Sequence, residues 1–213
     1  MRGMSGEYRE KDGVYMSELT TKEKLQYAAL DFFATKGYDA TTVDEIAESI
    51  GMKGPVIYKY FKGKEDLLYS LYTVKNDEYE KKMGINSDFP FWIHSGSELK
   101  QFTMHQLNYT IAEKYIVKFR RMCAINQFRD KSLSHEMTRH SYDNIVNLHI
   151  KIFKGMMELG ALEDCDPRLL AIEYTSPITV LMQICDREPE KKEELMKIAE
   201  EHIDFFIDKF CKK

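Results

Sequence analysis

Residues 41–68 read "TTVDEIAESIGMKGPVIYKYFKGKEDLL", and this stretch decides the fold of the N-terminal part of the chain. Thr42 and Glu45 have the spacing of a capping box, which begins a helix over the segment that follows. Gly51 ends this helix, because glycine readily adopts the positive φ found at helix C-termini. A second short helix is expected from Pro55 to Phe61, since proline is well tolerated in a first turn.

These two short helices carry the residues that a close helix crossing needs. Ala47 and Gly51, four positions apart, supply a small side chain where the second helix packs and a glycine in the turn. Apolar contacts between the helices are expected from Ile46, Ile50 and Ile57. A preceding helix begins at a second capping box, Thr20 and Glu23, and covers this core. The stretch therefore predicts a helix-turn-helix.

In such a motif the second helix lies in the major groove of DNA. Lysines on that helix meet phosphates or guanine edges, and a tyrosine hydroxyl bonds a phosphate. Two threonines at a helix N-terminus offer a further phosphate-binding site. A lysine at the start of the next helix is expected to clamp the DNA backbone. The candidate DNA-binding residues are Thr41, Thr42, Lys53, Gly54, Pro55, Val56, Tyr58, Lys59, Tyr60 and Lys64.

The overall charge does not point to nucleic acid. The chain has 31 lysines and arginines against 35 aspartates and glutamates, a net charge of −4, so any anion-binding surface must be local. Charge alone favours an alternative in which the lysines form an ordinary solvated face. The short helices, the spacing of Ala47 and Gly51, and the glycine stops favour the helix-turn-helix instead.

Residues 22–70 resemble the DNA-binding domain of TetR/AcrR-type transcriptional regulators. The resemblance rests on the run "AALDFFATKGYDATTVDEIA", on Gly51 and on "IYKYFKGKEDLL", and it covers about a quarter of the chain. One departure is Lys53, because many relatives have serine or threonine before the glycine at position 54. The second half of the chain has no match of comparable specificity.

The resemblance implies an all-α homodimer whose three N-terminal helices bind DNA and whose fourth helix links the two domains. The expected organisation is a flexible N-terminal extension at 1–17, a helix-turn-helix DNA-binding domain at 18–63, a linking helix at 64–84 and a helical ligand-binding and dimerisation domain at 85–213. The implied function is that of a cytoplasmic, ligand-responsive repressor. It would bind a palindromic operator and be released by an unidentified small molecule.

Two long helices are expected near the C-terminus. Segment 166–186 is apolar nearly all round and should kink at Pro177, and segment 189–211 is amphipathic. One short recognition helix seldom supplies enough contacts, so these helices from two chains are expected to form a four-helix homodimer interface. The alternative is that they only close the core of a monomer.

A ligand pocket is expected among the middle helices, where polar groups lie in apolar surroundings. For each candidate residue, a place in the core is the alternative to a ligand contact. The candidates are Met104, His105, Tyr109, Met122, Gln127, Phe128, His149, Phe153 and Tyr174.

Enzyme chemistry, cofactors and metals are not indicated. The histidines of "HEMTRH" at positions 135 and 140 are five apart, whereas an HExxH zinc site needs four, and no P-loop, GxGxxG or GxSxG motif is present. The four cysteines lack CxxC spacing, and no apolar run has the length that a membrane span needs. The first alternative to a DNA-binding regulator is a helical dimeric module that has no DNA function and binds a small molecule or a protein. A helical enzyme is the third alternative.

Overall fold

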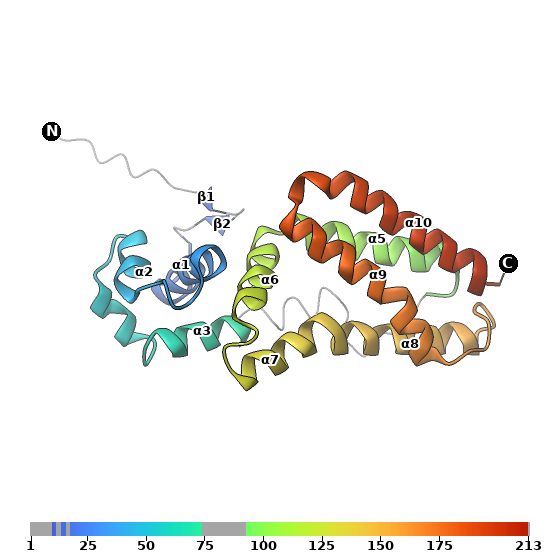
Figure 1. The fold of residues 1–213 in the computed structure, drawn as a ribbon, viewed down its shortest axis with the longest axis horizontal. Coiled ribbons are helices and arrows are strands. Elements are labelled where there is room, and N and C mark those ends of the chain that lie inside the picture. Colours follow the sequence, from blue (N-terminus) through green and yellow to red (C-terminus); the bar gives the residue numbers. More distant parts are fainter. Residues whose placement is uncertain (1–9, 12–13, 16–17, 74–92, 213) are drawn as a thin grey trace. The chain divides into compact units, whose positions relative to one another are not determined.

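The computed structural model describes residues 10–11, 14–15, 18–73 and 93–212 and is shown in Figure 1. The chain divides into two compact units. The first consists of Met1–Asn76 together with Glu113–Phe128, and the second of Asp77–Ala112 together with Arg129–Lys213. Both units are built from helices, which confirms the predicted all-α fold class.

The first unit holds the predicted helix-turn-helix and one helix from much later in the chain. Its elements are β1 (Glu10–Lys11), β2 (Val14–Tyr15), α1 (Thr21–Lys36), α2 (Val43–Ser49), η1 (Gly54–Lys59), α3 (Lys64–Thr73) and α6 (Lys114–Asn126). The antiparallel strands β1 and β2 lie within the stretch that was expected to be a flexible extension. Of the expected linking helix at 64–84, α3 accounts for the first part, and positions 74–84 lie outside the described residues.

Both predicted capping boxes are present. The side chains of Thr20 and Thr42 accept hydrogen bonds from the backbone N–H groups of Glu23 and Glu45, and each glutamate reaches back to its cap residue. Gly51 follows α2 with φ of +75°, the conformation that glycine adopts at little cost. Local signals in the sequence therefore set where α1 and α2 begin and where α2 ends.

Helix α6 packs against α1, a grouping that the sequence did not indicate. The rings of Tyr27 on α1 and Tyr115 on α6 meet edge to face with centroids 5.2 Å apart. Lys118 on α6 forms an ion pair with Asp31 on α1. Ring contacts of this kind contribute beyond simple burial, so α6 belongs structurally with the N-terminal helices.

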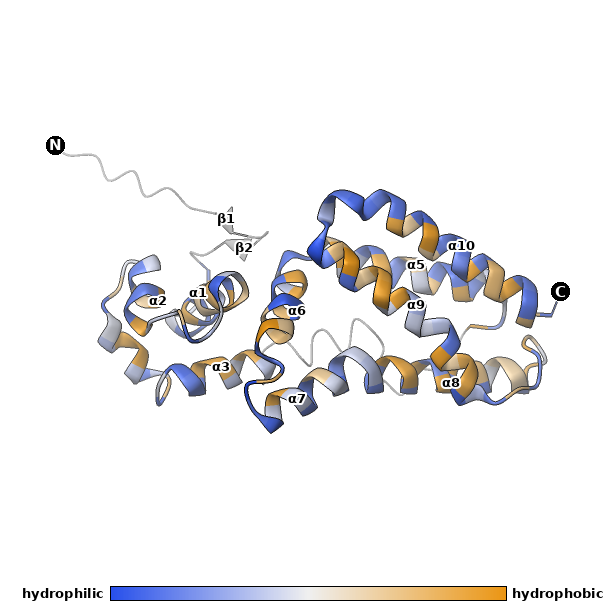
Figure 2. Ribbon diagram, viewed as in Figure 1, coloured by the Kyte–Doolittle hydropathy of each residue, from blue (hydrophilic) through white to orange (hydrophobic). Residues whose placement is uncertain are grey.

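The second unit is a helical bundle. Its elements are α5 (Gly96–Ala112), α7 (Lys131–Thr138), η2 (Arg139–Asp143), α8 (Asn144–Glu158), α9 (Pro167–Arg187), η3 (Pro189–Lys191) and α10 (Lys192–Phe210). The rings of Phe153, Tyr174 and Phe206 form the centre of its core. The ring centroids of Tyr174 and Phe206 are 4.6 Å apart. In Figure 2 α10 is mainly hydrophilic with apolar residues interspersed, as its amphipathic pattern predicts. Helix α9 continues through Pro177.

Candidate nucleic-acid interface and pocket

The crossing of α2 and η1 is tightly packed. Ile46 and Ala47 on α2 and Ile57 on η1 are all 0% exposed, as expected for a helix-turn-helix core. Gly54 at the start of η1 lies so close to α2 that a Cβ atom there would be 1.6 Å from Oδ1 of Asp44. Gly54 is one of the candidate DNA-binding residues. It is buried, and the close approach that it allows is to α2.

Several candidate DNA-binding residues are exposed around η1. Tyr58 is 62% exposed and Tyr60 41%, whereas Phe61 is only 4% exposed and belongs to the core. Lys53, Pro55 and Lys59 are also exposed, and Val56 is half-buried. The motif therefore presents two cations and two tyrosines on the outer surface of η1 and at its two ends.

Three candidates are engaged in contacts within the protein. Thr41 is 1% exposed, and its hydroxyl donates to the carbonyl oxygen of Gly37 at 2.7 Å, so it lies in the interior and not in a phosphate-binding site. Lys64 Nζ, which was expected to clamp the DNA backbone, donates to the carbonyl oxygens of Tyr38 and Thr41. Thr42 is exposed, but its hydroxyl is the cap of α2 and donates to Glu45 Oε2 at 2.9 Å.

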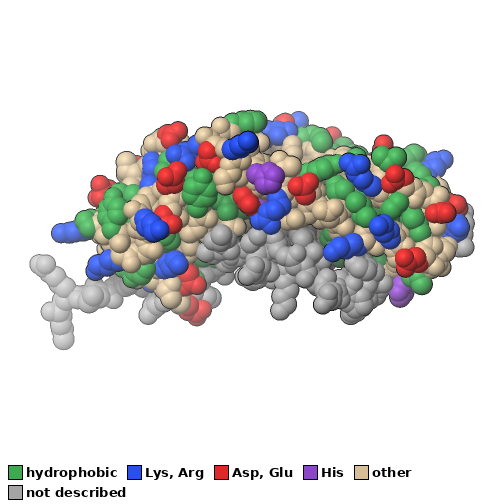
Figure 3. Space-filling model, turned by 90° about the horizontal axis from the view of Figure 1, so that it is seen from below, with side chains coloured by type: hydrophobic (Ala, Val, Ile, Leu, Met, Phe, Trp, Pro, Cys, Tyr) green, Lys and Arg blue, Asp and Glu red, His purple; other side chains and the backbone are tan. Residues whose placement is uncertain are grey.

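The N-terminus of α2 already holds a carboxylate. Glu45 accepts hydrogen bonds from Lys36 and from the backbone and hydroxyl of Thr42, and these bonds lower the pKa of its carboxyl to about 2. Such a carboxylate satisfies the N–H group that a phosphate would otherwise use. Basic and acidic side chains are interspersed on the face of the molecule shown in Figure 3. This face is therefore not uniformly basic.

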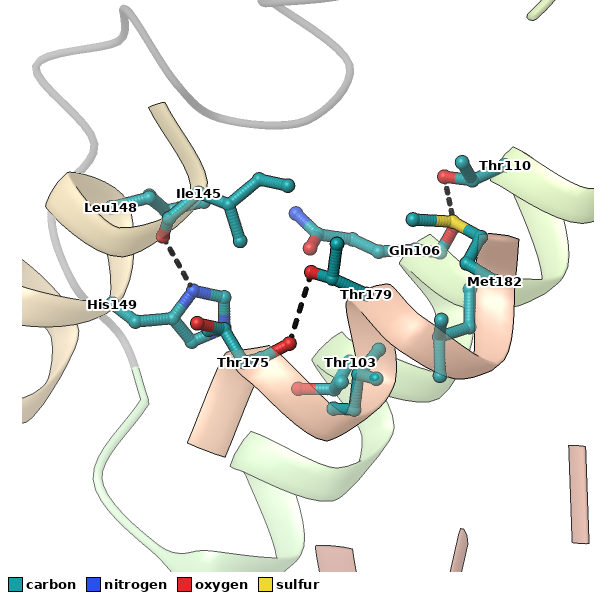
Figure 4. A pocket seen from close by; sticks show the side chains of 11 residues that line it. Thr103, Gln106, Thr110, Ile145, Leu148, His149, Thr175, Thr179 and Met182 are labelled. Atoms are coloured by element: carbon teal, nitrogen blue, oxygen red, sulfur yellow. Dashed lines mark hydrogen bonds between the residues drawn. The ribbon is translucent and has the colours of Figure 1, made fainter. Parts of the chain in front are cut away.

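A pocket lies among α5, α8 and α9 in the second unit (Figure 4). Its volume is about 50 Å³. Threonines, one glutamine and one histidine supply the polar part of its wall, and aliphatic side chains and a methionine supply the rest. The lining residues are Thr103, Gln106, Leu107, Thr110, Ile145, Leu148, His149, Thr175, Ile178, Thr179 and Met182.

His149 is the predicted pocket residue that lines this cavity. Phe153 and Tyr174 are 0% exposed and lie in the core beside His149, and Tyr174 reaches the wall through a 2.7 Å hydrogen bond between its hydroxyl and that of Thr103. Met104 and Tyr109 are half-buried on α5 outside the lining, and His105 is exposed.

The remaining three pocket candidates belong to the first unit. Met122 is 0% exposed in its core, Phe128 is 88% exposed, and the Gln127 side-chain amide donates to the carbonyl oxygen of Ala124. These residues are not part of the lining of the pocket among α5, α8 and α9, and their helix α6 packs on α1. The signal that sequence reasoning missed is a row of threonines at helical spacing, 103 and 110 on α5 and 175 and 179 on α9.

The short crossed helices and the exposed lysines and tyrosines of η1 define a helix-turn-helix DNA-binding protein. Comparison with known proteins agrees, because residues 27–71 match the family described as bacterial regulatory proteins, tetR family. The DNA-binding part of the chain is therefore that of the TetR family of transcriptional regulators. Members of this family are non-enzymatic DNA-binding proteins.

Two curated relatives come from Bacillus subtilis. The chain is 28% identical to the uncharacterized HTH-type transcriptional regulator YhgD over 153 residues, which cover 70% of this chain and 76% of that protein. It is 39% identical to the fatty acid metabolism regulator protein over 56 residues, 26% of this chain and only 29% of that protein. The second likeness is therefore confined to a short part of the relative.

Among solved structures, the fold is similar to that of SmeT, the repressor of the Stenotrophomonas maltophilia multidrug efflux pump SmeDEF. The TM-score is 0.67 at 18% identity, with 91% of this chain and 92% of that chain covered. SmeT has also been solved in complex with triclosan. This likeness extends the shared fold across both units.

Two features are absent from the described residues. Within them, no helix combines the length and apolarity that crossing a membrane requires. In the same part of the chain, no three histidine, cysteine, aspartate or glutamate side chains are grouped so that they could hold a metal ion.

Proposed function

We propose that this protein is a ligand-responsive repressor that binds a palindromic operator as a homodimer. The observation that carries the proposal is the exposed set of Lys53, Tyr58, Lys59 and Tyr60 on and beside η1, above a fully buried crossing with α2. Lysines and tyrosine hydroxyls donate to phosphates, and the same lysines reach guanine edges in the major groove. Pro55, Val56 and Thr42 complete the surface near DNA.

Apolar side chains on α9 and α10 support the homodimer. Leu169 and Val180 are 59% and 52% exposed, and their spacing of three helical turns puts them on one face of α9. Ile198 and Phe205 are 41% and 60% exposed and share one face of α10, seven residues apart. Two copies of this pair of helices would form a four-helix interface that buries all four side chains from each protomer.

A dimer explains how a short recognition helix achieves specificity. Two half-sites one DNA turn apart require the two η1 segments to lie about 34–36 Å from each other. A small molecule that favours a different spacing would release the operator, and it shifts the equilibrium only by its difference in affinity for the two states. The pocket among α5, α8 and α9 is the place we assign to this effector. The SmeT–triclosan complex shows that a protein of this fold accepts a small molecule.

The test is recovery of bound fragments from the source genome, followed by mobility shift on the recovered operator. Wild-type protein is expected to give a salt-dependent shift, and Lys53→Met and Lys59→Met variants should each flatten the salt dependence. Each substitution removes two phosphate contacts from a dimer, so the slope of log K against log salt should fall by about two. The proposal fails if no genomic fragment shifts at low or moderate salt.

A further inference from the structure

The pocket among α5, α8 and α9 has a polar atom in its wall without a partner. His149 on α8 is 4% exposed, and its Nδ1 lies 2.9 Å from the carbonyl oxygen of Ile145. Because a carbonyl only accepts, Nδ1 carries the proton and donates, which leaves Nε2 as a lone-pair acceptor. Nε2 is buried, and no described residue lies within hydrogen-bonding reach of it.

The surroundings of the ring keep His149 neutral. Phe153 and Tyr174 pack on it with ring centroids 5.9 and 5.3 Å away. Burial lowers the pKa of the imidazole to about 4, so it is uncharged at neutral pH. A buried acceptor without a donor is a rare and costly feature of a folded protein, which marks it as a position for a ligand or water.

Two threonines of the same wall also present lone pairs. The Thr175 hydroxyl donates to the carbonyl oxygen of Ala171 at 2.7 Å. The Thr179 hydroxyl donates to the carbonyl oxygen of Thr175 at 3.0 Å, as Figure 4 shows. Each hydroxyl has a single hydrogen, so what remains available to a ligand is an acceptor. In Figure 4 the imidazole extends from α8 toward these threonines on α9.

The wall offers nothing to balance a charge. None of the 11 lining residues is an aspartate, glutamate, lysine or arginine, and the one histidine is neutral. Burying an ion without a counter-charge is strongly unfavourable. The pocket volume of about 50 Å³ has room for only a few water-sized groups, so the part of a ligand that lies inside it is compact.

We propose that the effector pocket binds an uncharged, compact group bearing a hydroxyl or N–H, which donates to Nε2 of His149. Leu107, Ile178 and Met182 cover the carbon skeleton of that group. Carboxylates and phosphates are disfavoured because nothing in the wall balances their charge, and a molecule without a donor leaves Nε2 unpaired. The inference names the chemical class of the effector and takes from the proposed function only the idea that occupancy of this pocket regulates DNA binding.

The test uses four probes of nearly the same shape, each with a central carbon and three heavy-atom substituents. 2-Propanol offers a hydroxyl donor and acetamide an N–H donor, whereas acetone offers no donor and acetate carries a negative charge. Each is titrated into the full chain without DNA at neutral pH, and the ¹⁵N resonance of His149 Nε2 is followed by NMR. 2-Propanol and acetamide should give saturable shifts with dissociation constants at least about tenfold lower than those of acetone and acetate.

A variant of the wall and a matched control locate the binding. Thr179→Val keeps the shape of the side chain and removes one acceptor, so it should weaken severalfold the binding of acetamide, whose two N–H hydrogens can be donated to Nε2 and to Thr179 together. Thr35→Val removes a similar helix-bonded hydroxyl from the exposed surface of α1 and should leave binding unchanged. Equal binding of acetone or acetate would overturn the inference. So would the absence of a saturable shift with every probe, since the cavity would then hold only water.

Failure of this inference is separable from failure of the proposed function. Selectivity among the probes is measured on the protein alone, and operator binding is measured by mobility shift. A selective pocket in a protein that shifts no DNA would reject the repressor and keep the pocket chemistry. An unselective pocket in a protein that shifts its operator would reject the pocket chemistry and keep the repressor.

Discussion

The Lys64 side chain is hydrogen-bonded to the backbone of Thr41. The ammonium group at the start of α3 donates to the carbonyl oxygen of Thr41 at 2.7 Å and to that of Tyr38 at 2.8 Å, and it lies 4.2 Å from the centroid of the Tyr38 ring. Charge-assisted hydrogen bonds of this kind are among the strong ones in proteins. They join α3 to the connection between α1 and α2, so Lys64 helps to hold the helix-turn-helix in shape.

Replacing Lys64 with methionine should therefore lower stability. Lys64→Met keeps the aliphatic stem but removes both hydrogen bonds, and we expect the free energy of unfolding to fall by about 1–3 kcal/mol. Urea denaturation followed by circular dichroism measures the change. Lys59→Met on the exposed surface of η1 is the control, and its stability should stay within about 0.5 kcal/mol of the wild type. A stable Lys64→Met protein with a flattened salt dependence of DNA binding would restore the phosphate-clamp role.

Gly54 and Asp44 give a second prediction. A Cβ at position 54 would overlap the Asp44 carboxylate, so Gly54→Ala must displace that side chain or separate η1 from α2. We expect a loss of about 1–2 kcal/mol of unfolding free energy and weaker operator binding. Thermal and urea unfolding of the purified variant measure the first effect.

The double variant shows whether the overlap is the cause. With Asp44→Ala in place, the atoms nearest to the new Cβ are gone apart from the Asp44 Cα at 3.4 Å, an ordinary contact. Gly54→Ala should then be close to neutral, or stabilising by a few tenths of a kcal/mol through lower unfolded-state entropy. Equal losses in both backgrounds would mean that the alanine disturbs something other than Asp44.

The helix-turn-helix was predictable because its signals are local. A capping box spans four residues and a glycine stop one, so Thr42, Glu45 and Gly51 could be assigned from the sequence alone. Which of two adjacent threonines faces inward depends on tertiary contacts. The Thr41 hydroxyl bonds to the carbonyl oxygen of Gly37 within the connection between α1 and α2, so its direction depends on how that connection folds.

The pocket could not be predicted in the same way. Its wall combines one face of each of three helices that are far apart in sequence, and a helical pattern does not say which neighbours a face will meet. Met122 and Phe128 were assigned to the pocket because α6 looked like one of the middle helices. The ring contact between Tyr27 and Tyr115 shows that α6 packs on α1.

The proposed dimer predicts the effect of a charge on α10. Phe205 is 60% exposed, and Phe205→Glu would bury a carboxylate in the interface, so the dimer dissociation constant should rise at least about 100-fold. Sedimentation velocity over a range of concentrations measures it. Leu159→Glu makes the same kind of change at a 59% exposed position just after α8 and should leave the dimer intact. An unchanged dimer in the Phe205 variant would place the interface elsewhere.

The buried His149 predicts how stability depends on pH. Burial lowers the pKa of its imidazole in the folded protein from 6.5 to about 4, so between these values the unfolded chain binds a proton that the folded protein does not. Stability is therefore fully present above pH 6.5 and falls as the pH is lowered toward 4. By pH 5 the loss from this residue alone should reach about 2 kcal/mol.

His149→Phe isolates this contribution, since phenylalanine fills the ring space and cannot take up a proton. Urea unfolding of both proteins between pH 7 and pH 4.5 should give a difference that grows in favour of the variant as the pH falls. Carboxylates and the other histidines are common to both proteins and cancel in the comparison. Parallel stability curves, or titration of the His149 ring near its ordinary pKa by NMR, would show that Nε2 is accessible to water. The unpaired acceptor that defines the pocket would then be solvated in the free protein, and a ligand would have to displace that water to reach it.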